Sequence, residues 1–289
     1  MFYRPGMVDA LADYESAGYV LFGVPFDRTS SFRAGSRWAP DAMRSASANF
    51  ESYNSFFDID LAELPIHDAG NFEAGVLVDD VLSELSLDVA GITEDGKIPI
   101  MMGGEHSLTL PCVKACAKRA EGKFGVVVLD AHFDLRDEFE GVKYNHACVS
   151  RHILEEVTDN YVTIGVRSGP KEEWDFAKDN DICYYTPEEV TSKGADTLVE
   201  EIKEYLDCDS IYLSLDMDAL DPAYAPALGT PEPFGLSSLE VRDIIRRLAP
   251  MSAGFDVMEI TPEYDSGQTA ILGAKFIREF IAAHAASME

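Results

Sequence analysis

One stretch of the chain, residues 124–136, restricts the possible fold more than any other. Its apolar, β-branched part, Gly125–Leu129, has the composition of a strand buried on both faces, as in parallel sheets. Asp130, His132 and Asp134 follow directly, at alternate positions. Side chains alternate in an extended chain, so these three groups point to one side at the carboxyl end of the strand. Open α/β sheets place their binding sites at that end.

Two further apolar runs end in residues of the same kind. The run Ser210–Leu215 leads into Asp216 and Asp218, and the run Ile98–Met102 leads through two glycines into His106. We expect the two glycines to let the backbone turn tightly. A single Asp-x-His pattern is usually a solvated loop. Three strand ends that together supply two histidines and four aspartates predict one common site.

The candidate ligands favour a pair of divalent cations. Four carboxylates in one place would repel one another and take up protons unless cations neutralise them. None of the six candidates is a cysteine, so a structural zinc site of Cys and His residues is a poor match. Carboxylates with a few imidazoles suit Mn²⁺, with Fe²⁺, Co²⁺ or Zn²⁺ as substitutes. Six ligands for two ions require shared carboxylates, and ions roughly 3.5 Å apart activate water, so the pattern predicts a hydrolase.

The segments around these ligands resemble the three signatures of the ureohydrolases, the family of arginases and agmatinases. The matching segments are 103–107, 130–134 and 214–222, and the likeness continues at 23–27 and 259–265. The resemblance covers nearly the whole chain, and its details are most similar to the archaeal agmatinase branch. It implies an arginase-like α/β fold: a three-layer α/β/α arrangement with a mostly parallel central sheet. Alternating strand and helix signals predict the same architecture.

The resemblance also implies roles for individual residues. Six residues would hold two Mn²⁺ ions: Asp130 and Asp216 as bridges, His106 and Asp134 on one ion, and His132 and Asp218 on the other. His146 stands where the family keeps its catalytic histidine, and an imidazole suits protonation of a departing amine. Glu259 would accept hydrogen bonds from a guanidinium in a two-pronged pair. The alternative for Glu259 is a carboxylate that caps the helix beside Thr261, and His152 is expected to be structural.

Three hypotheses for function follow. The first is hydrolysis of agmatine to putrescine and urea, a step in polyamine biosynthesis, by a Mn²⁺-dependent amidinohydrolase. The second is the same chemistry on N1-aminopropylagmatine, arginine, guanidinobutyrate or formiminoglutamate. The third is a catalytically inactive relative that binds a partner or an amine, and the complete ligand set argues against it. The family resemblance also suggests a homo-oligomer, either a trimer or a hexamer.

The tail of the substrate is where the sequence is least decisive. Arginases carry acidic residues suited to an α-amino group where this chain has Arg167–Pro170. Arg136 points the other way, since an arginine near the site would hold a carboxylate. Glu138, Glu140 and Glu173 are nearby acids that would meet a distal amine. We therefore expect agmatine or aminopropylagmatine to be hydrolysed far better than arginine.

Composition sets the remaining limits. The chain has 52 acidic and 23 basic residues and a net charge of −29, which argues against nucleic acid or an anionic membrane as a partner. Five scattered cysteines are typical of reduced thiols in a cytosolic protein. Residues 1–6 lack the apolar core of a signal peptide, and no run has transmembrane length. We expect a cytoplasmic protein with one domain, residues 1–289, that acts on a small cationic guanidino compound.

Overall fold

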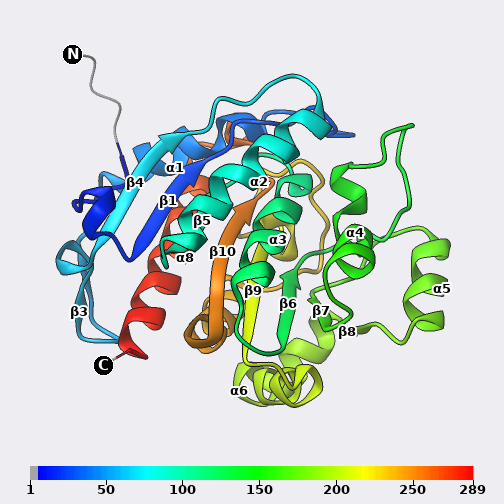
Figure 1. Cartoon of the computed structure of the whole chain (residues 1–289). Coiled ribbons are helices and arrows are strands. Elements are labelled where there is room, and N and C mark those ends of the chain that lie inside the picture. Colours follow the sequence, from blue (N-terminus) through cyan, green and yellow to red (C-terminus); the bar gives the residue numbers. More distant parts are fainter. Residues whose placement is uncertain (1–5, 289) are drawn as a thin grey trace.

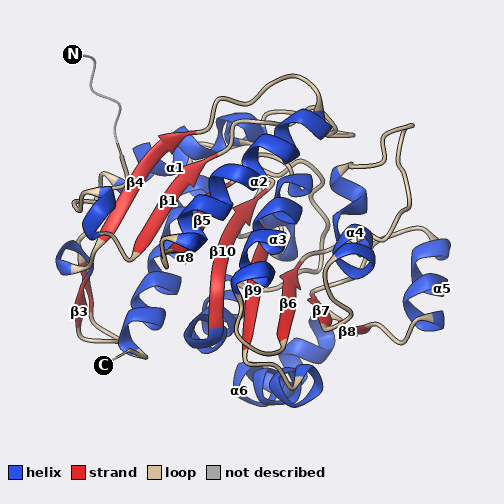
Figure 2. Ribbon diagram, in the orientation of Figure 1, coloured by secondary structure: helices blue, strands red, loops and turns tan. Residues whose placement is uncertain are grey.

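The computed structural model describes residues 6–288, and within them an eight-stranded sheet pairs all neighbouring strands in parallel (Figures 1 and 2). In chain order its strands are β1 Tyr19–Gly23, β4 Ile66–Asn71, β5 Ile98–Met102, β6 Phe124–Leu129, β7 Tyr161–Ile164, β8 Cys183–Tyr185, β9 Ser210–Asp216 and β10 Ser252–Met258. They lie in the order β4-β1-β5-β10-β9-β6-β7-β8. The expected parallel central sheet is confirmed. Residues 1–5, which form most of the segment cited for the absence of a signal peptide, lie outside the described residues.

Helices cover both faces of this sheet and complete three layers (Figure 1). Their bounds are α1 Ala39–Ser47, α2 Val78–Glu94, α3 Thr109–Arg119, α4 Val149–Glu156, α5 Lys171–Asp179, α6 Pro187–Leu206, α7 Ser238–Leu248 and α8 Gln268–Ala286. Helices α2, α3 and α4 pack with one apolar cluster, and α1, α6, α7 and α8 pack with the other. The expected α/β/α arrangement is therefore confirmed. Among residues 6–288, no helix combines the length and apolar character needed to cross a bilayer.

Local signals explain where two of the helices begin. Thr186 and Glu189 form a capping box at the start of α6, and Ser237 and Glu240 form another at the start of α7. Two features go beyond what the sequence predicts. Helix α5 follows β7, and β2 (Tyr53–Asn54) pairs with β3 (Ile59–Asp60) as a small antiparallel ribbon. Both are short, so their periodic patterns are weak.

The two glycines after β5 allow two segments to approach closely. Neither Gly103 nor Gly104 has a positive φ, so a turn does not require glycine at either position. A Cβ atom on Gly104 would lie 1.8 Å from the carbonyl oxygen of Phe26, and the N–H of Glu105 donates to that oxygen at 2.9 Å. The segment that follows β1 is thereby held against the segment that follows β5. This contact brings the loop after β1 to the edge of the sheet where the candidate ligands lie.

Candidate metal centre and active site

The carboxyl ends of four adjacent strands, β5, β10, β9 and β6, bring the candidate residues together. The six predicted ligands are His106 after β5, Asp130, His132 and Asp134 after β6, and Asp216 and Asp218 at the end of β9. All are buried except His132, which is partly exposed. The convergence follows from parallel pairing, because the ends of parallel strands meet at the same edge of a sheet.

The first group of ligands surrounds His106. Its Nδ1 atom lies 3.1 Å from Oδ2 of Asp130, 3.2 Å from Oδ2 of Asp134 and 3.4 Å from Oδ2 of Asp216. One ligand atom each from His106, Asp130 and Asp216 lies within 4.8 Å of the others. An imidazole nitrogen that faces three carboxylate oxygens in a buried site has the arrangement of a cation site.

The second group is built on the same aspartate. Nδ1 of His132 lies 3.0 Å from Oδ2 of Asp218 and 3.5 Å from Oδ1 of Asp130. Asp130 therefore offers Oδ2 to His106 and Oδ1 to His132. A carboxylate that presents one oxygen to each of two groups has the geometry of a bridging ligand.

The donor chemistry of the site fits divalent cations. Burial, together with the charge of Asp130, raises the pKa of Asp134 to about 7, and burial beside Asp218 and Asp130 raises the pKa of Asp216 well above its usual range. These carboxylates thus hold protons unless cations neutralise them. Oδ2 of Asp130 is buried and accepts no hydrogen bond from the described residues, although it lies close to His106. A buried carboxylate oxygen that lacks a hydrogen-bond donor and lies beside an imidazole nitrogen suits a cation that both atoms bind.

A buried network behind His106 fixes which ring nitrogen faces the carboxylates. Ser214 donates to Oδ1 of Asp256 at 2.6 Å, and Thr109 and Tyr212 donate to Oδ2 at 2.8 and 2.9 Å. Because the hydroxyl proton of Ser214 points to Asp256, the Nε2 atom of His106, 3.0 Å from the Ser214 oxygen, must donate. When the ring is neutral, its lone pair is then on Nδ1, as metal ligation requires. Sequence reasoning missed this network; its one signal is a carboxylate, Asp256, inside the otherwise apolar strand β10.

Glu259 lies beside the same group. It follows β10 with a φ of 63°, and its Oε1 atom accepts the backbone N–H of His106 at 2.8 Å. Burial, reinforced by the charge of Glu105, raises the pKa of the Glu259 carboxyl well above its usual range. The short turn Pro262–Tyr264 receives no side-chain cap from Thr261, and the Glu259 carboxylate bonds to His106 instead. The helix-cap alternative for Glu259 is therefore not what the structure has.

A cavity of about 110 Å³ opens onto the ligand groups. His132 and Asp134 form part of its wall, and His146 lines it from the loop before α4. Burial lowers the pKa of His146 to about 4. His152 lies elsewhere, with Nε2 2.9 Å from the carbonyl oxygen of Lys143, in agreement with a structural role.

A second cavity of about 460 Å³, the outer cavity, shares three lining residues with this one. The shared residues are Arg136, Phe139 and Glu173. Nε of Arg136 donates to Oε1 of Glu173 at 2.8 Å, and the guanidinium lies 4.1 Å from the ring centre of Phe139. The positive charge of Arg136 is thus already paired. Glu138 also lines the outer cavity, and both it and Glu140 are exposed.

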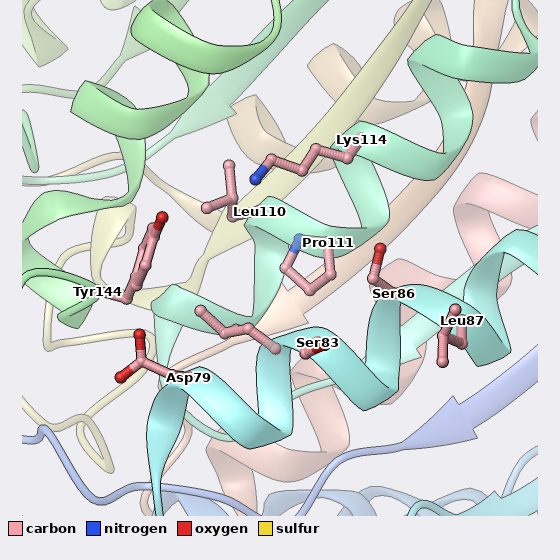
Figure 3. Close-up of a pocket in the computed structure, with 9 residues that line it drawn as sticks. Asp79, Ser83, Ser86, Leu87, Leu110, Pro111, Lys114 and Tyr144 are labelled. Carbon is pink, nitrogen blue, oxygen red and sulfur yellow. The ribbon is translucent and has the colours of Figure 1, made fainter.

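A third hollow, of about 340 Å³, lies between α2 and α3 and is separate from this chemistry (Figure 3). Asp79, Ser83 and Ser86 of α2 face Pro111 and Lys114 of α3 across it. No histidine is among the residues that line it. The candidate active site is the smaller cavity at the ligand groups.

Known proteins share this fold and much of this sequence. The model of the arginase family matches residues 17–283. The N(1)-aminopropylagmatine ureohydrolase of Thermococcus kodakarensis is 39% identical over 277 residues, which are 92% of this chain and 91% of that protein. The agmatinase of Pyrococcus horikoshii is 37% identical over 270 residues, 92% of this chain and 91% of that protein. The crystal structure of the agmatine ureohydrolase of Thermoplasma volcanium matches with a TM-score of 0.93 and 40% identity, and covers 100% of this chain and 97% of that one.

Proposed function

Because the chain belongs to the arginase family, we propose that it is a binuclear Mn²⁺ amidinohydrolase that cleaves agmatine to putrescine and urea. The observation that carries this proposal is the position of Asp130, whose two oxygens face different histidines. Hydrolysis of C–N bonds in linear amidines is the reaction class of the family, and the relatives named above include agmatinases. Two Mn²⁺ ions per chain would be held by the six ligands, with Asp130 and Asp216 as the bridges.

The chemistry of a guanidinium explains the need for such a site. Resonance shields its carbon, so neutral water attacks it poorly, and a bound pair of cations would supply a stronger nucleophile by lowering the pKa of water. Glu259 would accept two hydrogen bonds from the guanidinium and hold it over the ligand groups. His146 lines the same cavity and would take up a proton that the attacking water loses and pass it to the departing amine.

The wall of the cavity favours an amine over a carboxylate at the far end of the substrate. Arg136 is paired with Glu173, so it offers little free positive charge to a carboxylate. Glu138 and Glu172 line the outer cavity and add negative charge. Placing an unpaired carboxylate there would cost several kcal/mol, enough for a preference of about 10³ against arginine.

N1-aminopropylagmatine is a second candidate substrate. The outer cavity of about 460 Å³ shares three lining residues with the inner one and is also lined by Asp137, Glu138 and Glu172. It would give a longer substrate with a further amine both room and opposite charge.

A urea-release assay across guanidino compounds tests the proposal. We expect Mn²⁺-loaded protein to hydrolyse agmatine or aminopropylagmatine with kcat/KM about 10³ above that of arginine or 4-guanidinobutyrate. Comparable values for arginine or 4-guanidinobutyrate would overturn the choice of substrate, and no urea from any compound would favour an inactive relative.

A pair of histidine variants tests the proton donor. We expect His146→Ala to lower kcat by roughly 10² with the metal content unchanged, because only the proton donor is removed. His152→Ala is the control and should leave kcat close to that of the unaltered protein. An unchanged kcat in His146→Ala would assign His146 a structural role.

Assembly and location complete the proposal. We infer a homo-oligomer, a trimer or hexamer, from the likeness to the family, and multi-angle light scattering measures it directly. We infer a cytoplasmic location from the free state of the five cysteines, of which three are buried.

A further inference from the structure

We propose that Thr29 and Glu105 are positioning residues that hold His146 in one tautomer, with the proton on Nδ1 and the lone pair on Nε2. The role of that tautomer in catalysis rests on the proposed function, whereas the tautomer itself does not. Thr29 and Glu105 lie on different segments, after β1 and after β5, and His146 lies on a third, before α4.

The carboxylate of Glu105 anchors the arrangement. It is fully buried and accepts three hydrogen bonds. Oε2 accepts the backbone N–H of Thr29 at 2.7 Å, and Oε1 accepts the hydroxyls of Thr29 and Ser107, each at 2.6 Å. A carboxylate with three donors is a strong acceptor for the hydroxyl of Thr29.

The hydroxyl of Thr29 has one proton and three polar neighbours. Its oxygen lies 2.6 Å from Oε1 of Glu105, 3.0 Å from the backbone nitrogen of His146 and 3.2 Å from Nδ1 of His146. The shortest contact is to the carboxylate, so the proton points to Glu105. The lone pairs of the oxygen then accept the backbone N–H and the Nδ1–H of His146.

The remaining nitrogen of the ring faces the active-site cavity. Nε2 of His146 lies 3.3 Å from the hydroxyl of Ser31, and both residues line the cavity beside His132 and Asp134. The ring of Phe139 meets the imidazole edge-on, with centroids 6.2 Å apart and planes at 82°, which further limits its rotation. In this tautomer Nε2 carries the lone pair of the ring and lies next to the Ser31 hydroxyl. Nε2 is therefore the ring atom that can take up a proton and release it toward a substrate, while Nδ1–H stays bonded to Thr29.

The loop after β1 is fixed so that Thr29 can reach a residue 117 positions away. The side chain of Asp27 links two later residues of the same loop. Its Oδ2 accepts the N–H of Gly35 at 2.8 Å, and its carboxylate pairs with Arg37. On the other side, the close contact between Gly104 and Phe26 sets the distance between the two segments. The position of Thr29 is therefore fixed by the Asp27 carboxylate within its own loop and by the contact between Gly104 and Phe26.

The first test compares two substitutions at Thr29. Thr29→Val removes the hydroxyl at nearly constant volume, and we expect kcat to fall by about 10-fold to 100-fold with KM changed by less than about threefold. Thr29→Ser keeps the hydroxyl and should restore kcat to within about threefold of the unaltered protein, with an unchanged metal content in both variants. A kcat in Thr29→Val within about threefold of the unaltered value, or a Ser variant as impaired as the Val variant, would overturn the positioning role.

The second test reads the tautomer without any assay of catalysis. The ¹⁵N spectrum of histidine-labelled protein, loaded with diamagnetic Zn²⁺ and recorded with magic-angle spinning, distinguishes protonated from unprotonated ring nitrogens. His146 is assigned among the six histidines from the signal lost in His146→Gln. We expect a protonated Nδ1 and an unprotonated Nε2. The opposite tautomer would mean that Thr29 donates to the ring, and it would overturn the proposal even if agmatine proves to be the substrate.

Discussion

Glu259 accepts the backbone N–H of His106 at 2.8 Å, so the residue after β10 is fixed against the candidate ligand that follows β5. Its φ of 63° lies in the left-handed region, as does the φ of 52° at Asp134. Such a conformation costs a non-glycine residue about 1 kcal/mol or more and persists where the surroundings determine it. Both residues contact His106, which indicates that the fold sacrifices some stability to place their carboxylates there.

Replacement of Glu259 tests what its carboxylate does. We expect Glu259→Gln to lower kcat/KM for agmatine by about 100-fold, because hydrogen bonds between charged groups contribute roughly 1.5–3 kcal/mol. The amide still accepts the N–H of His106, so the metal content should stay constant. Glu263→Gln, an exposed neighbour, is the matched control and should behave as the unaltered protein does. Loss of metal from Glu259→Gln would instead assign Glu259 to the support of the ligands.

Removal of cations should make stability depend on pH. After chelation, the raised pKa of Asp134, about 7, means that folding favours its protonated form, so its contribution to stability falls as pH rises toward 7. Burial lowers the pKa of His106, but its bonds to Asp130 and Asp134 outweigh burial and leave the pKa well raised. The stabilisation from a raised histidine is also lost as pH rises, so both effects have the same sign.

The gain in Tm on adding Mn²⁺ should therefore increase from pH 5 to pH 8, since cations replace the protons of the site. Differential scanning fluorimetry with and without Mn²⁺ measures this gain, and Mn²⁺ should also restore activity after chelation. A gain in Tm that shrinks over this range, or full activity after verified metal removal, would contradict the dinuclear site.

The ion pair between Arg136 and Glu173 makes selectivity testable. Glu173→Gln would leave the positive charge of Arg136 unpaired in the wall of both cavities. We expect the ratio of kcat/KM for agmatine to that for 4-guanidinobutyrate to fall by about 10-fold, which corresponds to about 1.4 kcal/mol. Asp179→Asn, exposed at the other end of α5 and outside the lining of both cavities, should change the ratio much less. An equal change in both variants would place the substrate tail away from Arg136.

The sequence predicts that the candidate ligands converge, because each one follows a strongly apolar strand. Parallel pairing then brings Asp130 and Asp216 to one edge, whatever the exact strand order. The long apolar pattern of residues 268–286 also predicts a helix, and α8 has these bounds, Gln268–Ala286. Elements with short patterns, such as α5, are harder to predict, because a nine-residue run contains too few repeats.

Contacts between residues far apart in the chain could not be predicted from the sequence. Thr29 and Glu105 meet across 76 positions, and Ser214 meets Asp256 across 42. Each residue alone is ordinary in its own stretch, and its role depends on which strand ends become neighbours. The close approach of Gly104 to Phe26 has the same origin, since it needs the register of β1 against β5.

An ion pair between Asp68 and Arg44 joins β4, at the edge of the sheet, to α1, and neither residue belongs to the candidate metal centre. Asp68 on β4 accepts two bonds from Arg44 of α1, from Nε at 2.8 Å and from a terminal nitrogen at 2.8 Å, and it also accepts the N–H of Met7 at 2.9 Å. Both side chains of the pair are nearly buried, with 4% and 5% exposure. Asp68→Asn would remove the buried ion-pair partner of Arg44 and leave it only the exposed Asp41, which costs about 3 kcal/mol and lowers Tm by roughly 5 °C or more.

The pH dependence of this loss has a definite sign. Burial raises the pKa of Asp68, but the bonds from Arg44 outweigh it and leave the pKa below its usual value. The stabilisation is therefore complete above about pH 4 and is lost as pH falls through the lowered pKa. The difference in Tm between Asp68→Asn and the unaltered protein should be full at pH 7 and should shrink toward pH 3. Asp41→Asn, an exposed contact of the same arginine, is the control and should change Tm by less than about 1 °C. A deficit in Asp68→Asn that stays constant from pH 7 to pH 3 would show that packing, rather than the ion pair, holds β4 to α1.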